Sequence, residues 1–228
     1  MNRSKAVFAL LRKEMSGVEL CKDMLVVKPT EHIVRGFLIE TTTEKDRIYL
    51  WRVVTPLYRP MKSIFLDYST RIPETGADIY IDRNEYRKSV DAIRAIVSAN
   101  LEYLQHIEAP KDFLRHVSWM IGNSSINFRF DLALTYHRIG ELDRCRDMLQ
   151  ALKTEVDRSD PQFRMPVDQA IKHAAHAIEA NPTTFPDLLN EWERMNIERL
   201  GLRSSCVVSN EPDPGKAERV TSRAKRLH

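Results

Sequence analysis

Two arginines on one face of a predicted hairpin are the residues of this chain that best match a small-ligand site. If residues 32–42 and 47–55 form neighbouring antiparallel strands, the pleat places Arg35 and Arg52 diagonally on a face that is otherwise almost entirely apolar. An unpaired charge on a core face costs a large free energy. We therefore expect one of two arrangements. Either an acid such as Asp67 pairs with the arginines, or a phosphate or carboxylate ligand binds between their guanidinium groups.

His173 and His176 have the spacing of metal ligands, since both lie on one face of a predicted helix. A site would still need further ligands from another segment, such as His137, and we therefore predict no metal. His32, beside Glu31 at the start of a strand, has the chemistry of an acid–base group, although a histidine without function is the alternative there.

Sequence motifs for catalysis are missing from the rest of the chain. The seven glycines do not cluster, which excludes the common phosphate-binding loops. The chain also has no nucleophile elbow, no HExxH motif and no CxxC motif. We predict no catalytic residue and no cofactor, and we favour a role without catalysis.

The composition is that of a folded globular protein. The 228 residues are 43% hydrophobic and 29% charged, and the formal net charge is +3. The stretch from Arg203 onward holds six basic and three acidic residues, which leaves 29 of each in the rest of the chain. Because Pro212 and Pro214 interrupt this stretch, we predict that residues 202–228 form a basic, disordered tail. Nucleic acid bound through this tail is a second alternative function.

The cysteines and the apolar runs indicate a cytoplasmic protein. The three cysteines are odd in number and far apart, as expected for reduced thiols. No apolar run approaches the roughly 20 residues of a membrane helix. Arg12, Lys13 and Glu14 also interrupt the N-terminal apolar run too early for a secretory signal. We predict no contact with a membrane.

The hydrophobic periodicity predicts an α+β fold. Residues 4–20 show helical spacing, and the period then changes to two as β-branched and aromatic residues become frequent. We expect an N-terminal antiparallel sheet of about four strands, followed by a C-terminal stack of about six helices. The expected strands are 24–28, 32–42, 47–55 and 63–70. The expected regions are 1–80 for the first helix and the sheet, 81–201 for the helices packed on it, and 202–228 for the tail.

Helical spacing continues from about residue 80 to 201. A long helix with Val90, Ile93 and Val97 on one side should lie against the sheet. The following helices are expected from Pro110 to about 121, within 128–156 as a hairpin, from about 161 to 180, and from Pro182, with Asn181 as its N-cap.

Residues 128–156 read as two helices joined at Gly140. Ala133 and Cys145 are small enough to let the helices approach closely, and Tyr136 would fill the gap between them. This order of residue types, with Leu132 before Ala133, resembles one tetratricopeptide repeat. The resemblance implies a surface that holds a peptide or a partner helix. It covers only about 30 residues, and arrays need at least about three repeats, so a plain helical hairpin is the alternative.

We predict from these features a non-catalytic protein that binds another protein, as an adaptor or an immunity-type partner. Candidate contact residues are Tyr49 and Trp51 on the exposed face of the sheet, and Tyr136, Arg144 and Arg146 on the hairpin. The alternative is a small-anion binding protein or enzyme that uses the arginine pair. The sequence leaves the partner and the oligomeric state open.

Overall fold

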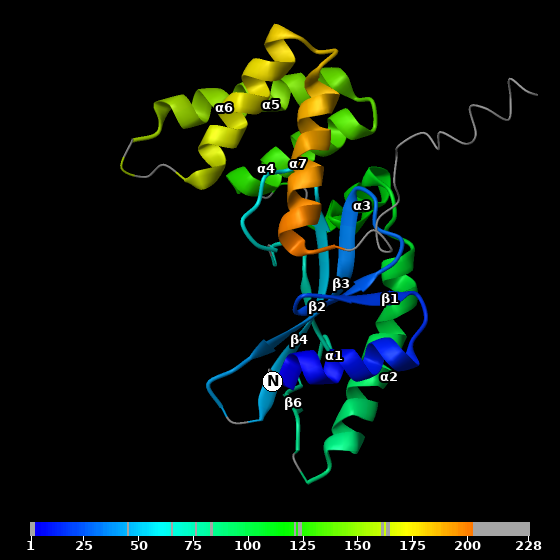
Figure 1. Cartoon of the computed structure of the whole chain (residues 1–228). Coiled ribbons are helices and arrows are strands. Elements are labelled where there is room, and N and C mark those ends of the chain that lie inside the picture. Colours follow the sequence, from blue (N-terminus) through cyan, green and yellow to red (C-terminus); the bar gives the residue numbers. More distant parts are fainter. Residues whose placement is uncertain are drawn as a thin grey trace, which may run out of the picture.

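The computed structural model describes residues 3–202, apart from Lys45, Phe65, Gly76, Arg83, Ile121, Asn123, Ser124, Pro161, Phe163 and Arg164, and it describes side chains from Ala6 onward. Within these residues the chain has the expected α+β fold, an antiparallel sheet followed by helices (Figure 1). The strands are β1 (Val18–Cys21), β2 (Met24–Val27), β3 (Ile33–Thr41), β4 (Arg47–Pro56), β5 (Thr70–Ile72) and β6 (Ile79–Tyr80). They lie in the order β1-β2-β3-β4-β5, with β6 also paired to β4, and every pairing is antiparallel.

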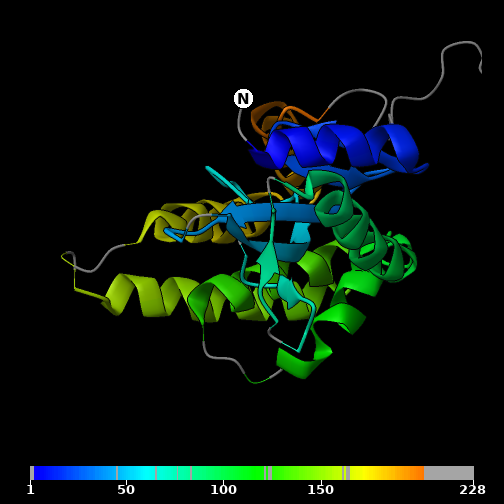
Figure 2. The ribbon, with the colours of Figure 1, turned by 90° about the horizontal axis from the view of Figure 1, so that it is seen from below.

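The helices cover one face of the sheet and then form a separate layer beyond one end of it. They are α1 (Arg3–Glu14), α2 (Tyr86–Gln105), α3 (Pro110–His116), the 3₁₀ helix η1 (Ser118–Met120), α4 (Ile126–Arg138), α5 (Leu142–Arg158), α6 (Pro166–Ala180) and α7 (Phe185–Leu200). Helices α1 and α2 lie against the sheet. Beyond it, α4 packs on α5, α5 on α6, and α6 on α7 (Figures 1 and 2). One apolar cluster extends from α1 to α7, so the sheet and the helices share a continuous core.

The central hairpin has the register that the sequence predicts. Strands β3 and β4 pair Arg35 with Val54 and Phe37 with Arg52, which places the two arginines diagonally on one face. The apolar neighbours on this face are buried against the helices, and α2 lies on β2 and β3 as expected. Its contact stripe consists of Val90, Ile93, Val97 and Leu104.

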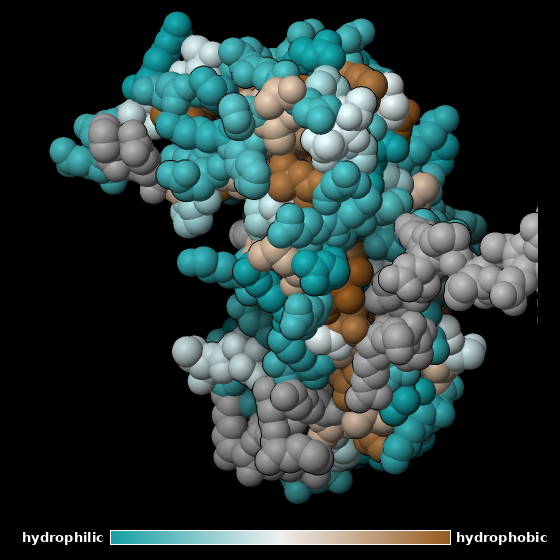
Figure 3. Space-filling model, turned by 45° about the horizontal axis from the view of Figure 1, so that its top comes forward, coloured by the Kyte–Doolittle hydropathy of each residue, from teal (hydrophilic) through white to brown (hydrophobic). Residues whose placement is uncertain are grey.

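The opposite face of the sheet is covered at one end, although the sequence predicts an exposed surface. Val34 and Val53 are fully buried in a second apolar cluster, to which Ile197, Leu200 and Leu202 at the end of α7 contribute. The Lys22 ammonium group donates a hydrogen bond to a carbonyl oxygen in the last turn of α7, where a cation is favourable. Figure 3 shows one face of the molecule as mainly hydrophilic, with a narrow hydrophobic stripe down its middle.

Helices α4 and α5 form the expected hairpin around Gly140. Gly140 has a φ of 86°, and the next amide, of Glu141, donates a hydrogen bond of 2.9 Å to the Tyr136 carbonyl oxygen. Ala133 and Cys145 are fully buried where the two helices meet. Small residues and a left-handed glycine therefore produce the close pairing that their spacing predicts.

The first predicted helix ends earlier than expected. Helix α1 stops at Glu14, and Gly17 has a φ of 77°, which interrupts the right-handed helical backbone. Val18 then pairs with Val27 as part of β1. The prediction of a helix to residue 20 is wrong because strand pairing overrides the helical spacing of Met15 and Val18.

The predicted strand at 63–70 is also wrong. Asp67 and Tyr68 form a turn closed by the Ser69 amide on the Leu66 carbonyl oxygen, and β5 begins only at Thr70. The apolar side chains of this stretch pack on helices and on the second cluster, so their alternation does not reflect a strand.

The last two helices begin later than predicted. Helix α6 starts at Pro166, and α7 starts at Phe185. Asn181 does not cap α7: its side-chain oxygen accepts a hydrogen bond from the Thr183 amide and forms a turn before the helix. Of the predicted tail, Leu202 is buried, and all residues beyond it lie outside the described part of the chain.

Gly36 provides a test of the packing between β2 and β3. A Cβ atom at this position would lie 2.2 Å from the Leu25 carbonyl oxygen. Gly36→Ala should lower the free energy of unfolding by about 3 kcal/mol, because the added methyl group clashes with a backbone atom that cannot move aside as a flexible side chain can. Gly140→Ala is the matched control: no atom lies within 4 Å of its Cβ, and only its left-handed backbone costs about 1 kcal/mol. Equal losses of unfolding free energy for the two variants, measured by urea unfolding, would contradict this close packing.

Candidate functional site

A buried ion pair lies where the connection between β4 and β5 crosses the helical layer. Arg59, on this connection, is 2% exposed, and its Nε lies 3.1 Å from Oδ1 of Asp131, in the middle of α4. The Tyr68 hydroxyl donates a hydrogen bond to the other carboxylate oxygen of Asp131. Burial raises the pKa of Asp131 to about 6, although Arg59 and the hydrogen bond from Tyr68 both oppose this shift.

Polar contacts extend from this pair along α4. The Thr135 hydroxyl donates to the Asp131 carbonyl oxygen over 2.6 Å and also forms a 2.6 Å hydrogen bond with the Tyr58 hydroxyl. Burial raises the pKa of the Tyr58 hydroxyl, so this group stays protonated. Tyr58 and Thr135 therefore fix the start of the connection against α4.

Helix α7 holds the same connection from the other side. The Asn196 amide nitrogen donates to the carbonyl oxygens of Leu57 and Arg59, at 2.7 and 2.6 Å, and its oxygen accepts from the Met61 amide at 3.3 Å. Arg199 Nη1 donates to the Met61 carbonyl oxygen at 2.9 Å. An irregular stretch of chain thus obtains the backbone hydrogen bonds that a strand would find in a sheet.

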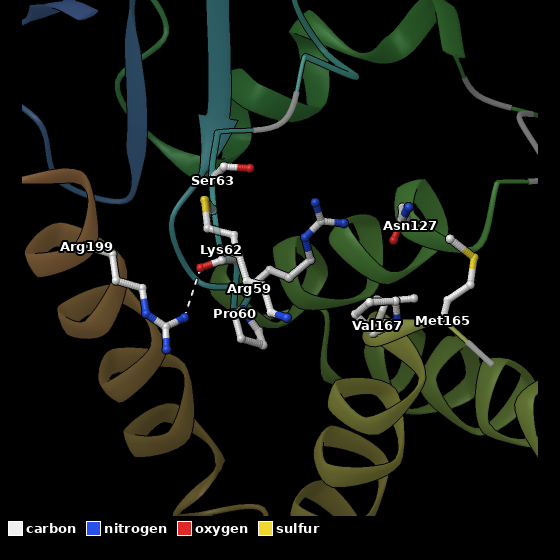
Figure 4. A pocket seen from close by; sticks show the side chains of 10 residues that line it. Arg59, Pro60, Lys62, Ser63, Asn127, Met165, Val167 and Arg199 are labelled. Carbon is white, nitrogen blue, oxygen red and sulfur yellow. Dashed lines mark hydrogen bonds between the residues drawn. The ribbon is translucent and has the colours of Figure 1, made fainter. Parts of the chain in front are cut away.

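A pocket of about 310 Å³ opens beside this connection, and we call it the junction pocket (Figure 4). It lies between the connection, the first turns of α4 and α6, and α7. Pro60, Met61, Met165, Pro166 and Val167 provide apolar walls, and Arg59, Lys62, Ser63, Asn127 and Arg199 provide the polar groups. Apolar walls with a few polar groups are typical of ligand sites.

The junction pocket has an excess of positive charge. Arg59 is opposed by Asp131, but no carboxylate among the described residues forms an ion pair with Lys62 or Arg199. No acidic residue contributes to the pocket lining within the described ranges. Both cations are exposed, so an anionic group that approaches the pocket from solvent would be attracted to them.

A second hollow of about 240 Å³ adjoins the junction pocket, and we call it the Asp67 hollow. Its lining consists of Asp67, Met120, Ser125, Asn127 and Phe128. Asn127 belongs to both hollows, at the start of α4. The two hollows therefore meet at one side chain, with cations in one and a carboxylate in the other.

The structure keeps Arg35 and Arg52 on one face of the sheet but gives them different partners and places Asp67 elsewhere. Arg35 donates hydrogen bonds to the carbonyl oxygens of Pro29, Ile107 and Gln105, and burial lowers its pKa. Arg52 binds Asn100 Oδ1 at 2.9 Å and Glu74 Oε1 at 3.0 Å. Backbone carbonyl oxygens thus accept the hydrogen bonds of Arg35, Glu74 forms an ion pair with Arg52, and Asp67 lies in the hollow at α4.

The predicted contact residues lie on two separate surfaces. The Arg71 guanidinium carbon lies 3.8 Å from the centre of the Tyr49 ring. The Trp51 indole nitrogen donates a hydrogen bond of 2.8 Å to the Glu40 carboxylate. Both aromatic side chains are half-buried.

On the hairpin, Arg144 pairs with Glu141 and stacks on Tyr136, whereas Arg146 pairs with Asp143. These are exposed pairs three residues apart, whose contribution to stability is small.

His32 forms a hydrogen bond and His173 a ring contact, whereas His176 is exposed. His173 lies edge-on against Trp192, and no group of three or more metal-ligating side chains occurs among the described residues. His32 Nδ1 lies 2.9 Å from Glu193 Oε1, which also lies 2.8 Å from Arg138 Nη2.

Sequence reasoning missed the residues that form the junction pocket. The predicted strands 47–55 and 63–70 leave only a short link between them, so no pattern singles out Arg59 and Lys62. One signal was present: Asp131 interrupts an apolar stretch of a predicted helix, and a buried acid requires a partner. Nothing local indicates that the partner lies 72 residues earlier in the chain.

Comparison of this chain with family models, with curated proteins and with solved structures gave no match. The likeness of α4 and α5 to a tetratricopeptide repeat therefore stays a prediction. Among the described residues, no helix has the length and apolar character needed to cross a membrane.

Asn196→Ala tests how far the connection depends on α7. The substitution leaves two carbonyl oxygens and one amide without their buried partner, and we expect a loss of about 3 kcal/mol in the free energy of unfolding. Asn190→Ala, an exposed position on the same helix, should cost less than about 0.5 kcal/mol. Similar losses at both positions in urea unfolding would show that the three hydrogen bonds are unimportant.

Asp131 should make stability depend on pH. Its pKa is raised to about 6 in the folded protein, so between about pH 4 and 6 the folded state binds more protons than the unfolded state. The contribution of Asp131 to the free energy of unfolding therefore falls as pH rises through this window, by up to about 1.4 kcal/mol per pH unit.

Asp131→Asn removes this titration. The free energy of unfolding of the wild type minus that of the variant should decrease from about pH 4 to 6 and stay level above about pH 7. Subtraction of the variant also removes the shared effects of Glu14 and Asp157, whose pKa values are lowered by their basic partners. A difference that stays constant with pH would mean that Asp131 titrates at an ordinary pKa.

Proposed function

We propose that the protein is a non-catalytic interaction protein, an adaptor or neutralising partner, whose junction pocket receives an acidic and partly apolar segment of another polypeptide. The observation that supports this most is the pair Lys62 and Arg199. Both side chains line the pocket, and neither forms an ion pair with a carboxylate in the described part of the chain.

The chemistry of the pocket favours an occupant with two kinds of group. An aspartate or glutamate of a partner could reach Lys62 and Arg199, where a carboxylate would gain charge-assisted hydrogen bonds. Apolar side chains next to that acid would be buried against Met61, Met165 and Val167. Methionines adapt to different shapes, which suits a surface that accepts a polypeptide.

The size of the site also favours a polypeptide segment. A volume of about 310 Å³ is at the low end for pockets that enclose a small molecule. It accommodates a few side chains, and a longer segment would continue past Asn127 into the Asp67 hollow. The tetratricopeptide-like hairpin contributes to this site through the first turn of α4, and its charged outer face at Arg144 and Arg146 is a second candidate contact surface.

We further propose a cytoplasmic setting for this interaction. Cys145 is a free, buried thiol, and burial raises its pKa to about 12, which keeps it unreactive. A free thiol in the core agrees with a reducing compartment.

Selection of binders from a phage-displayed library of random dodecapeptides tests this function. Peptides enriched on the immobilised wild-type protein should contain aspartate or glutamate beside large apolar residues. Their affinity, measured by fluorescence polarisation, should fall at least about tenfold on the double variant Lys62→Glu and Arg199→Glu, because two attractive charges become repulsive.

The double variant Arg144→Glu and Arg146→Glu reverses the same amount of charge on the outer face of α5 and is the matched control. Unchanged binding to it would assign the interaction to the junction pocket, whereas a loss confined to it would move the interface to the hairpin. Succinate that binds as tightly as the selected peptides would instead indicate a small-molecule site. All variants must first show the wild-type melting temperature.

A further inference from the structure

The Asp67 hollow has an uncompensated negative charge. Asp67 is exposed, and no cation among the described residues forms an ion pair with it. Its charge also acts on the buried network, since it helps to raise the pKa values of Tyr68 and Asp131. Two carboxylates thus lie near each other, and Arg59 forms an ion pair with Asp131.

The start of α4 is the nearest source of positive potential for Asp67. Ser125, Asn127 and Phe128 line the hollow at the first turn of this helix. A helix N-terminus supplies about half of an elementary charge, which is less than a carboxylate requires. The hollow therefore keeps a net attraction for a cation.

The walls of the Asp67 hollow suit the side chain of a lysine or an arginine. The partly exposed Met120 offers apolar surface to an aliphatic stem, while Asp67 and the Asn127 side-chain oxygen offer acceptors to the charged head. A compact inorganic cation would make no use of the apolar wall. An organic cation on a flexible stem therefore fits better.

We infer that the partner segment contains a basic residue as well as the acidic one, and that the two charges set its direction in the groove. This inference rests on the proposed function. The acid lies at Lys62 and Arg199, the base lies at Asp67, and the backbone between them passes Asn127. No other described residue forms a hydrogen bond with the Asn127 side chain, which leaves its amide available to that backbone.

This arrangement restricts the sequence of the partner. Side chains on the same side of an extended segment are separated by an even number of positions. Peptides selected on the wild-type protein should therefore contain an acid and a base at positions i and i+2 or i and i+4, always in the same order. A segment with the reverse order would place like charges together in both hollows.

A double-mutant cycle with Asp67→Asn tests the inference. The most strongly selected peptide and its version with the basic residue replaced by glutamine are measured against wild-type protein and against Asp67→Asn by fluorescence polarisation. Removal of the base should weaken binding to the wild type about fivefold, because the pair is partly exposed, and should have little effect on binding to the variant. Higher salt should reduce the difference.

The outcomes separate this inference from the proposed function. Selected peptides without a recurrent base, or equal losses on both proteins, would overturn the inference, while binding that still depends on Lys62 and Arg199 would leave the proposed function intact. If no peptide is enriched, or if the charge reversal at Lys62 and Arg199 does not weaken binding, both the inference and the proposed function are overturned. Asp67→Asn removes an exposed charge without changing side-chain size, and its melting temperature confirms that the fold is unchanged.

Discussion

The ion pair of Arg59 with Asp131 is the interaction on which the junction between sheet and helices depends. Both side chains are removed from solvent, one on the connection after β4 and the other on α4. The attraction within such a pair roughly offsets the cost of its desolvation, but loss of one partner leaves a buried charge at a cost of about 3–5 kcal/mol. The pair therefore contributes less to net stability than to the choice of one conformation. Only a connection that places Arg59 beside Asp131, with Tyr68 at the second carboxylate oxygen and Asn196 on the backbone, satisfies all of these groups.

The same constraint determines the electrostatics of the groove. Because Asp131 neutralises Arg59 from the inside, the charges left for a partner are those of Lys62 and Arg199 in one hollow and Asp67 in the other. Lys62 and Asp67 lie on the connection, which α4 and α7 hold at Tyr58 and Met61, and Arg199 lies on α7 itself. The irregular connection thus supplies half of the residues that line the junction pocket, and α4, α6 and α7 supply most of the others. Loops held by a rigid scaffold are common binding sites for this reason.

Regular elements could be predicted because their information is local. The alternation of residues in β3 and β4 predicted a register that the structure confirms, including the diagonal of Arg35 and Arg52. Gly140 with Ala133 and Cys145 likewise predicted the hairpin of α4 and α5. Failures occurred where distant contacts override local spacing, as in β1, which pairs with β2 instead of extending a helix. Buried arginines were the hardest case, since the partners of Arg35 are carbonyl oxygens some 70 residues away and at Pro29.

The sequence by itself determined the α+β class, with an antiparallel sheet followed by helices, the central hairpin, and the neutral balance of charge outside the C-terminal stretch. These properties depend on composition and on periods of two and 3.6 residues, which any short window of the chain contains. Only the tertiary structure decided which charged groups are neutralised and which remain free to meet a partner. Ion pairing depends on distances of a few ångströms between segments far apart in the chain. Arg59 and Asp131 meet in this way. Lys62, Arg199 and Asp67 stay at the surface.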